Sequence, residues 1–396
     1  MKKNILFVHT TGPWWDHRYY FKQMPALQKE FANITYLVKE DKSIKDCPFA
    51  LVTVSAKKIK WARLTGGLNL FFYLLTSRQD AIQLCNIELL PVGILLGLFS
   101  RKKIFYDCRE DHYHAMLHSK VWFPKWFRYF LGFGVKVIEF FAAKTFTGFI
   151  DSDPAIYKFH TFMPDHKKMI FYNMALAEQF NSPSIDRSEK KFDFTVLGSM
   201  SIRTGVLDVV KSIASLNKQG IATNLKLIGD PESDRRLFEQ IQDVIQTNEI
   251  QNHIFITGRV PYFRIPFELA DCKVGIIPLL DLPKFQNNIA TKQFEYMASE
   301  MPVIATNLPP QQIFIQEGFN GFHYEPGNID ELRSKMQYFL TNPDEIRRMG
   351  GNAFRKINLD WTSESQQAKY IEFYKLRMEN KPYREKQIPP FNIQTV

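Results

Sequence analysis

The sequence has few cysteines, no long apolar stretch and no surplus of acidic residues. Its four cysteines among 396 residues have neither CxxC nor metal-ligand spacing, which argues against a disulfide framework and against a zinc site. The longest apolar run, residues 89–99, contains a proline and two glycines and is too short to cross a bilayer. Residues 1–10 have only a short apolar run, so we expect a first strand there instead of a signal peptide.

The charge of the chain indicates an anionic partner. Lysine and arginine total 51 against 41 aspartate and glutamate, which gives a net charge of +10. Such a charge suits a nucleotide diphosphate, a phospholipid surface or a nucleic acid. Because the sequence has no zinc-finger pattern, RNP-like motif or dense basic stripe, no nucleic-acid partner is expected.

Short apolar runs alternate with helical patterns along the chain, which predicts parallel sheets with helices on both faces. The predicted strands are residues 5–8, 34–38, 81–85, 103–106 and 146–150, then 192–197, 224–228, 253–256, 274–277, 302–305 and 321–324. The predicted fold class is therefore α/β, with two doubly wound Rossmann-like domains that face each other across a cleft.

The segment 290–307, with the sequence ATKQFEYMASEMPVIATN, is the most informative part of the chain. It places Glu295 on an otherwise apolar helix that ends before Pro302 and leads into a buried strand. One explanation without any function is that Glu295 pairs with Lys292, one turn earlier, on a solvated face. The alternative explanation is that Glu295 binds a ligand.

This segment resembles the signature of the family 4 glycosyltransferases, enzymes of the GT-B fold, in which the glutamate at the position of Glu295 holds the ribose of the nucleotide-sugar donor. Glu300 stands where the family usually has glycine, so the turn at that position is expected to be built differently. The resemblance covers most of the chain and is closest between residues 196 and 324.

The domain boundaries follow from composition and from this resemblance. Residues 181–191 are polar and contain proline and serine, as an interdomain linker does. The linker separates an acceptor-side domain, residues 1–180, from a donor-binding domain, residues 192–358. In the resembled fold a C-terminal helix, here residues 359–380, crosses back to the first domain, and a mobile basic tail, residues 381–396, is expected after it.

The resemblance also implies how the donor is bound. The loop 196–205 corresponds to the loop that grips the diphosphate, and Arg203 is expected to serve there with Lys292, because Ser199 and Thr204 stand where basic residues often do. Asn287 replaces a second glutamate that contacts the transferred sugar, so the sugar is not inferred by analogy. The expected donor-binding residues are Gly12, Ser199, Arg203, Val260, Asn287, Asn288, Thr291, Lys292 and Glu295.

Two segments of the first domain are candidates for the acceptor side. Residues 107–112 resemble the family's Y-D-x-H-E segment, with Arg109 where histidine is frequent, and we predict Arg109 and Glu110 as catalytic residues, Glu110 orienting the acceptor. His112 and His114 are alternatives. In the opening loop, Asp16 follows Gly12 and is equally well explained as a helix cap.

No metal and no cofactor are expected. Asp151-Ser152-Asp153 looks like the Asp-x-Asp metal motif of a different glycosyltransferase fold, but Ser-Asp-Pro is a good helix start and we assign it to capping. Arg203 and Lys292 can neutralise a diphosphate without a metal ion.

The segment 121–141 combines aromatic and basic residues at helical spacing. One face is expected to carry Trp122, Trp126, Tyr129, Phe130 and Phe133, and another Lys125, Arg128 and Lys136. Such a helix suits a membrane interface or a lipid-linked acceptor, and the proposed surface comprises Trp122, Lys125, Trp126 and Arg128. A packed helix with a solvated basic side is the alternative.

These observations predict a metal-independent glycosyltransferase that moves a sugar from a nucleotide-sugar to an acceptor hydroxyl. Retention at the anomeric carbon, a saccharide or lipid-linked acceptor of surface polysaccharide synthesis, and a cytoplasmic location at the inner face of a membrane are implied by the resemblance. Two alternatives stay open: a nucleotide-sugar 2-epimerase of the same fold, and a non-catalytic binding or scaffold subunit.

Overall fold

The computed structural model describes residues 3–41, 44, 47–54, 67–119, 123–180, 190–361 and 363–385. These residues form two compact units, the first made of the chain up to Asn173 together with residues from Glu364 onward, the second of Met174–Ser363. The chain thus changes unit after Asn173, earlier than the predicted linker 181–191, most of which lies outside the described residues. Met174–Phe180 belong to the second unit because this stretch, with the short helix α8 (Ala177–Phe180), packs against α13 (Lys292–Ala298).

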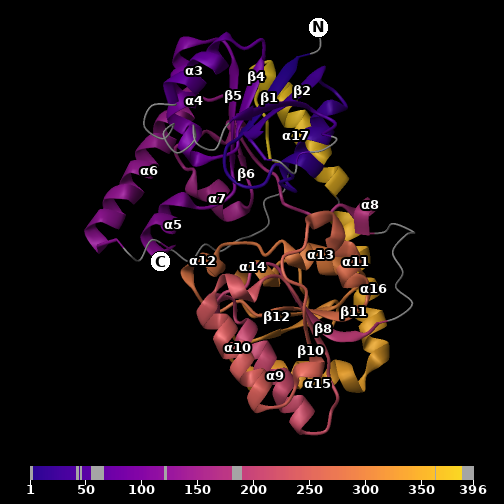
Figure 1. The fold of residues 1–396 in the computed structure, drawn as a ribbon. Helices are drawn as coiled ribbons and strands as arrows, with labels where there is room; N and C mark the ends of the chain where they lie inside the picture. Colours follow the sequence, from indigo (N-terminus) through magenta and orange to yellow (C-terminus); the bar gives the residue numbers. More distant parts are fainter. Residues whose placement is uncertain are drawn as a thin grey trace. The chain divides into compact units, whose positions relative to one another are not determined.

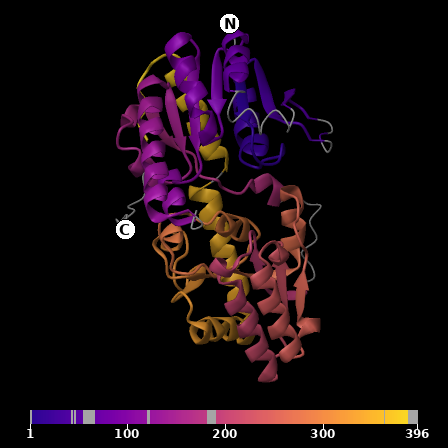
Figure 2. The same ribbon diagram turned by 60° about the vertical axis from the view of Figure 1, so that its left-hand side comes forward.

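The first unit is built on a seven-stranded parallel sheet of order β3-β2-β1-β4-β5-β6-β7, with helices on both faces (Figures 1 and 2). Its strands are β1 Asn4–His9, β2 Asn33–Lys39, β3 Ala50–Val54, β4 Ala81–Leu84, β5 Lys103–Cys108, β6 Gly148–Asp151 and β7 Lys168–Ile170. Its main helices are α1 Met24–Gln28, α3 Gly67–Thr76, α4 Leu90–Phe99, α5 His112–Ser119, α6 Lys125–Thr145, α7 Pro154–Phe159 and α17 Ser363–Met378.

The apolar runs of the strands supply both faces of this sheet. In β1, Ile5 and Phe7 belong to one buried cluster, whereas Leu6 and Val8 belong to the cluster on the other face. The sequence pattern missed β3 and β7, which are the two edge strands. β7 has only three residues, and β3 is only partly buried although residues 49–52 are all apolar.

The C-terminal helix α17 completes the core of the first unit. Tyr370, Phe373 and Tyr374 lie in the same buried cluster as Ile5 and Phe7. The hydroxyl of Tyr370 donates a hydrogen bond of 2.6 Å to Oε1 of Gln83, a fully buried residue of β4. This bond and the aromatic packing hold the last helix against the sheet.

The structure corrects the expected C-terminal boundaries. Residues 359–380 are not one helix, since α16 (Pro343–Asp360) ends before Trp361 and α17 begins at Ser363. The beginning of the predicted mobile tail is packed: Tyr383 is buried against Phe373, and Glu385 accepts a hydrogen bond from the backbone of Ile170. Residues 386–396 lie outside the described part of the chain.

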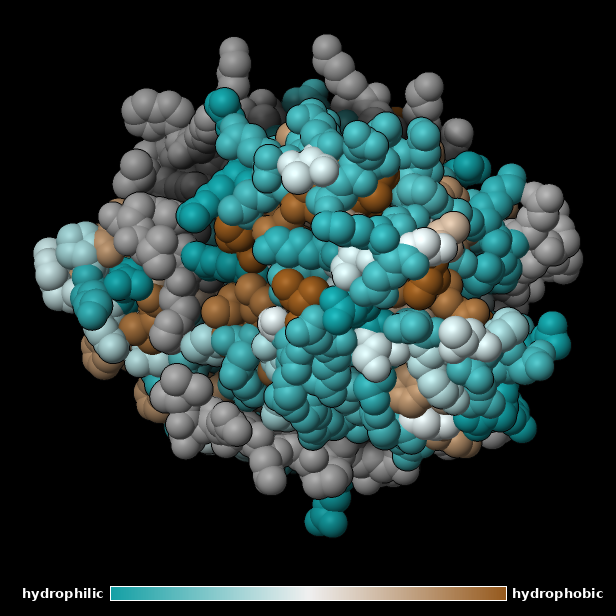
Figure 3. Space-filling model, turned by 90° about the horizontal axis from the view of Figure 1, so that it is seen from below, coloured by the Kyte–Doolittle hydropathy of each residue, from teal (hydrophilic) through white to brown (hydrophobic). Residues whose placement is uncertain are grey.

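The second unit has a six-stranded parallel sheet of order β10-β9-β8-β11-β12-β13. Its strands are β8 Phe192–Leu197, β9 Leu225–Ile228, β10 Ile254–Ile256, β11 Cys272–Ile277, β12 Val303–Thr306 and β13 Gly321–Tyr324. Its helices besides α8, α13 and α16 are α9 Val206–Lys218, α10 Arg235–Thr247, α11 Ile265–Ala270, α12 Pro283–Gln286, α14 Pro309–Gln312 and α15 Ile329–Thr341. Seen from the end where α9, α10 and α15 lie, the surface is mostly hydrophilic, with hydrophobic residues in small separate groups (Figure 3).

The turn after α13 keeps the geometry of a glycine although it holds a glutamate. Glu300 has a φ of 57°, in the left-handed region. The carbonyl of Glu300 lies only 2.2 Å from where a Cβ on Gly350 of α16 would stand, so close packing of α16 fixes this turn. At Glu300 the chain therefore places a glutamate in a backbone conformation that favours glycine.

Tyr296 closes a gap in the second sheet. The pairing between β8 and β11 ends at Thr195 and Gly275, and beyond it the backbone amide of Leu197 donates a 2.7 Å hydrogen bond to the hydroxyl of Tyr296 on α13. Gly275 makes room for the ring, because a Cβ there would stand 2.4 Å from it. The hydroxyl thus takes the place of a strand partner.

Tyr296→Phe removes that hydroxyl and leaves the buried Leu197 amide without its acceptor. We expect a loss of about 1–3 kcal/mol in the free energy of unfolding, measured by urea denaturation. Tyr324→Phe is the matched control, since Tyr324 is equally buried in the second unit and its hydroxyl makes no hydrogen bond to any residue the structure describes. Equal stability losses in the two variants would contradict this role for Tyr296.

Candidate donor-binding and acceptor-side residues

The carboxyl ends of β8 and β11 mark the point where the strand order of the second sheet reverses. From β8 the sheet continues through β9 and β10, and from β11 it continues through β12 and β13. Parallel α/β sheets bind nucleotides just outside such a switch point. The loop 198–205, which follows β8, and the segment 287–295, which contains the start of α13, come together here.

Glycines shape the loop 198–205. Gly205 has a φ of 66°, and a Cβ at this position would lie 1.8 Å from the carbonyl oxygen of Pro278, so no other residue fits without moving the backbone. Thr204 is used by the loop itself: its hydroxyl accepts a hydrogen bond from the amide of Ser201 and donates one to the carbonyl of the same residue. The loop is thereby fixed at the amino end of α9.

Lys292 carries a positive charge beside this loop. Its ammonium nitrogen lies 3.8 Å from where a Cβ of Gly198 would stand, and within the described residues it has no hydrogen bond or ion pair. Burial lowers the pKa of Lys292 to about 8, although the charge of Glu295 acts in the opposite direction. An unpaired, desolvated ammonium next to a glycine loop is well placed to receive an anion.

Glu295 lies one helical turn after Lys292 and is buried, at 9% exposure, which excludes the solvated ion pair considered from the sequence alone. Tyr262 lies beside it: burial raises the pKa of the Tyr262 phenol well above its usual value, and the charge of Glu295 raises it further. Tyr262 immediately follows the loop that carries Val260, which is partly exposed. Glu295 therefore lies close to the loop that carries Val260.

The other predicted donor-binding residues differ in their environment. Arg203 and Ser199 are exposed, and Arg203 forms no ion pair with any described residue. Asn287 is partly buried and its Oδ1 atom has no hydrogen-bond partner among the residues described. Asn288 and Thr291 are partly exposed just before α13, and the side chain of Thr291 does not cap the helix. Since α13 has only seven residues, side-chain cations contribute more positive charge here than its dipole.

The first unit gathers several predicted residues at the end of β1. Gly12 has a φ of 90°, and a Cβ there would lie 3.2 Å from the His9 ring. Asp16 accepts a hydrogen bond from the amide of Arg18 and also pairs with Arg109 at 2.6 Å. Burial alone would raise the pKa of Asp16, but the charge of Arg109 and neighbouring histidines hold it well below its usual value. One carboxylate oxygen of Asp16 therefore holds the turn at Arg18, and the other pairs with Arg109.

Arg109 and Glu110 occupy different environments. The guanidinium of Arg109 is held by Asp16 and lies over the Tyr19 ring, 5.4 Å from its centroid. An arginine stays protonated, so it cannot act as a proton acceptor. Glu110 is exposed, and within the described chain its carboxylate makes no hydrogen bond or ion pair. Of the two, Glu110 is the residue that is free to contact an acceptor.

The Asp-Ser-Asp segment behaves as predicted for a cap. Oδ1 of Asp153 accepts a hydrogen bond from the amide of Ile156 at the start of α7. Asp151 pairs with His160, at 2.8 Å. The two acids therefore already have separate partners.

Helix α6 exposes the predicted aromatic face. Trp126, Tyr129, Phe130 and Phe133 are 60–71% exposed, and Phe140 and Phe141 extend the face. Of the predicted basic side, Lys136 is exposed and lies over the ring of Tyr113 in α5, whereas Arg128 is partly buried and donates a hydrogen bond to the carbonyl of Leu117. Lys125 is exposed, and Trp122 lies outside the described residues.

This helix is not a transmembrane helix. In the described ranges of the chain, none of the helices has the length and hydropathy needed to span a bilayer.

Comparison with known families identifies the second unit. Residues 177–356 match the family Glycosyl transferases group 1. The second unit carries a group 1 glycosyltransferase domain. A curated relative, an uncharacterized glycosyltransferase of Methanocaldococcus jannaschii, is 26% identical over 129 residues, which are 33% of this chain and 34% of the relative. The match thus spans about a third of that protein's length.

Solved structures show that the fold extends beyond the group 1 domain. HepE of Anabaena, in complex with UDP and glucose, aligns with a TM-score of 0.74 and 14% identity, covering 94% of this chain and 99% of its own. Sucrose-phosphate synthase of Thermosynechococcus elongatus aligns with a TM-score of 0.72 and 13% identity, covering 96% and 100%. These alignments confirm the predicted GT-B fold with its two parallel-sheet α/β domains.

Sequence reasoning missed two residues of these neighbourhoods. His9 ends β1 beside Gly12, and burial lowers its pKa to about 4, so it is neutral there. Tyr262 adjoins Glu295 of the group 1 domain. A histidine directly before the glycine loop was a usable signal for His9. The sequence contains no comparable signal for Tyr262, because its neighbour Glu295 is distant in the sequence.

Gly205→Ala tests whether the loop after β8 depends on glycine at this position. The added Cβ would overlap the Pro278 carbonyl, so we expect a clear loss of thermal stability, measured by thermal denaturation. Gly351→Ala on α16 is the control, since nothing lies within 4 Å of its Cβ position and alanine favours a helix. If Gly205→Ala unfolds at the same temperature as the unmodified protein, the loop does not need glycine at position 205.

Proposed function

We propose that this protein is a glycosyltransferase that moves a sugar from a nucleotide-sugar donor to an acceptor hydroxyl. The observation that carries the proposal is the Lys292 ammonium beside the Gly198 loop, which forms no ion pair with a described residue, with the buried Glu295 one turn later in a group 1 domain. Lys292 and Arg203 would meet the charge that develops on the leaving diphosphate, and Glu295 would hold the ribose. Because the HepE structure is a complex with UDP and glucose, we take UDP as the first nucleotide to test.

We extend this proposal to the type of reaction, the acceptor and the residues that contact each substrate. We infer a retaining, metal-independent enzyme of the family 4 type, with Glu110 orienting the acceptor and Asn287 contacting the donor sugar. Oδ1 of Asn287, which has no hydrogen-bond partner in the described part of the chain, supports a contact to a hydroxyl, which an amide can make without adding negative charge. We infer a lipid-linked acceptor of surface polysaccharide synthesis at the inner face of a membrane, on the grounds of the exposed aromatic face of α6.

Calorimetric titration with UDP, GDP and ADP tests the donor site. We expect one of these nucleotides, UDP first, to bind the unmodified chain, and Lys292→Met, Arg203→Ala and Glu295→Ala each to weaken binding at least about tenfold. Lys218→Met is the matched control: it removes one exposed positive charge at the opposite end of α9, so its affinity should be unchanged. Failure of all three nucleotides to bind would favour the scaffold alternative.

The pH dependence of nucleotide binding tests the role of Lys292. A diphosphate binds the ammonium form, and with a pKa of about 8 that form is lost as the pH rises from 7 to 9. The affinity should therefore fall by about tenfold between pH 7 and pH 9. Lys292→Arg, which stays protonated, should bind with little change over this range. An equally steep fall in Lys292→Arg would assign the titration to another group.

Vesicle co-sedimentation tests the membrane surface. Replacing Trp126, Phe130 and Phe133 by serine should reduce binding to phosphatidylethanolamine–phosphatidylglycerol vesicles about tenfold or more, because three exposed apolar side chains no longer enter the interface. The control replaces Phe263, Phe267 and Phe319 of the second unit, which are 40–55% exposed. Equal binding by both triple variants would contradict a membrane role for α6.

A further inference from the structure

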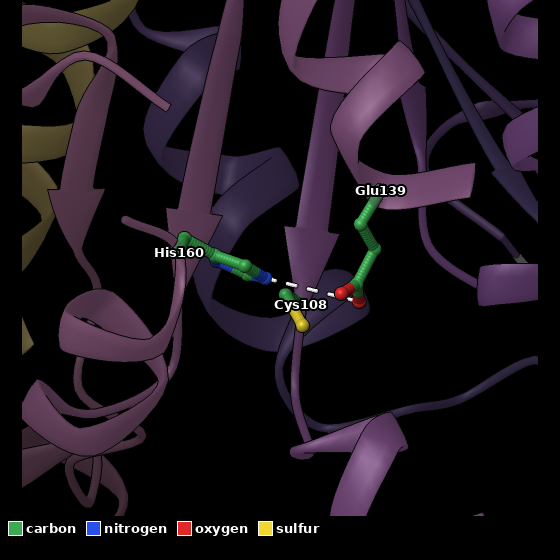
Figure 4. A group of neighbouring side chains, drawn as sticks. All are labelled: Cys108, Glu139 and His160. Atoms are coloured by element: carbon green, nitrogen blue, oxygen red, sulfur yellow. Dashed lines mark ion pairs between the residues drawn. The ribbon is translucent and has the colours of Figure 1, made fainter. Parts of the chain in front are cut away.

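Three buried side chains of metal-ligand type meet in the first unit, outside the residues proposed for the transfer reaction. They are Cys108, the last residue of β5, Glu139 on α6, and His160 directly after α7 (Figure 4). Their exposures are 1%, 6% and 3%, and one ligand atom of each lies within 4.8 Å of the other two. The spacing of the cysteines gives no sign of this cluster, because Cys108, Glu139 and His160 are far apart in the sequence.

His160 is oriented as a metal-bound histidine usually is. Its Nδ1 atom lies 2.8 Å from Oδ1 of Asp151, while its Nε2 atom lies 3.8 Å from Oε1 of Glu139. A carboxylate that holds one ring nitrogen and directs the other toward a metal is the common second layer of zinc sites. The carboxylate of Asp151 thus fixes the ring so that Nε2 points at the cluster.

Two further polar atoms beside the cluster have no partner in the part of the chain that the structure describes. They are Oδ2 of Asp151 and the hydroxyl of Tyr106, a fully buried residue. Tyr106 stands two residues before Cys108 on β5, and both side chains belong to the same buried cluster on one face of the sheet. Unsatisfied buried polar atoms are costly, so a missing polar component accounts for them better than an apolar core does.

We propose that Cys108, Glu139 and His160 bind a zinc ion. A thiolate, an imidazole and a carboxylate form a ligand set that suits Zn²⁺, with one position left for water. Tetrahedral bonding sets ligand atoms roughly 3.3–3.8 Å apart, so side-chain adjustments of about 1 Å or less complete the site. Binding displaces one proton from the Cys108 thiol and one from the His160 imidazolium, so the net charge of the cluster does not change.

The cluster can also exist without a metal ion, and the protonation of Cys108 distinguishes the metal-free state from the zinc-bound state. Without a metal, a protonated His160 pairs with Asp151 and Glu139, and these carboxylates, after the cost of burial, raise its pKa well above the usual value. This state leaves the Cys108 thiol protonated, because burial raises its pKa to about 12. Only zinc binding converts Cys108 to a thiolate, so a thiolate signal separates the two.

The proposed zinc ion would position the residues next to Cys108 and stabilise the first unit. It joins β5, α6 and the end of α7, and Cys108 directly precedes Arg109 and Glu110. The zinc would therefore hold the start of the acceptor-side segment. It is not assigned to the diphosphate, for which Lys292 and Arg203 are proposed.

Metal titration of the full chain tests the proposal. After removal of metals with a chelator, we expect the protein to bind one Zn²⁺ per chain and to unfold at a higher temperature with Zn²⁺ than with EDTA. Cys108→Ser and His160→Gln should each weaken Zn²⁺ binding about a hundredfold or more, and Asp151→Asn about ten- to a hundredfold. Cys85→Ser should bind normally, since Cys85 is a buried thiol that follows β4 as Cys108 ends β5.

Cobalt substitution keeps the test decisive if a variant fails to fold. Co²⁺ bound to the unmodified chain should show a thiolate-to-metal charge-transfer band in the near ultraviolet. The same band should persist when Cys47, Cys85 and Cys272 are all replaced by serine, which leaves Cys108 as the sole cysteine. No Zn²⁺ binding, or no thiolate band with Co²⁺ bound, would overturn the proposal.

Discussion

The hydroxyl of Tyr296 fills the gap where β8 and β11 separate, and it fixes the helix on which Lys292 and Glu295 stand. Without this contact the Leu197 amide would be buried without an acceptor, and α13 would lose a hydrogen bond that ties it to the end of β8, beyond the pairing with β11. Gly275 adapts to this contact by making room for the Tyr296 ring. The position of the cation therefore depends on a phenol that would not itself contact the ligand.

Most of the fold could be predicted because interior parallel strands have a strong sequence signal. β8 and β13 were predicted to the residue, and the other predicted strands, including the edge strand β10, to within two residues at either end. The edge strands β3 and β7 were not found, since one is partly exposed and the other has three residues. The change of unit after Asn173 was also missed, because it depends on where Met174–Phe180 pack and not on their composition.

The candidate site could be predicted only where its residues share one segment. Lys292 and Glu295 stand together in a recognisable motif, and the structure finds one beside the Gly198 loop and the other buried. The pairing of Arg109 with Asp16, the approach of Tyr262 to Glu295 and the meeting of Cys108 with His160 all join distant segments. Residue types do not reveal such pairings, since the strand order that produces them is a property of the whole sheet.

The central claim is that the loop after β8 and the start of α13 bind a nucleotide diphosphate. Hydrogen–deuterium exchange of the full chain, with and without UDP, tests it most directly because it locates the protected amides. The account predicts slower exchange in peptides covering residues 198–205 and 287–292, and no such change in Lys292→Met. Protection confined to other segments, or equal protection in Lys292→Met, would contradict it.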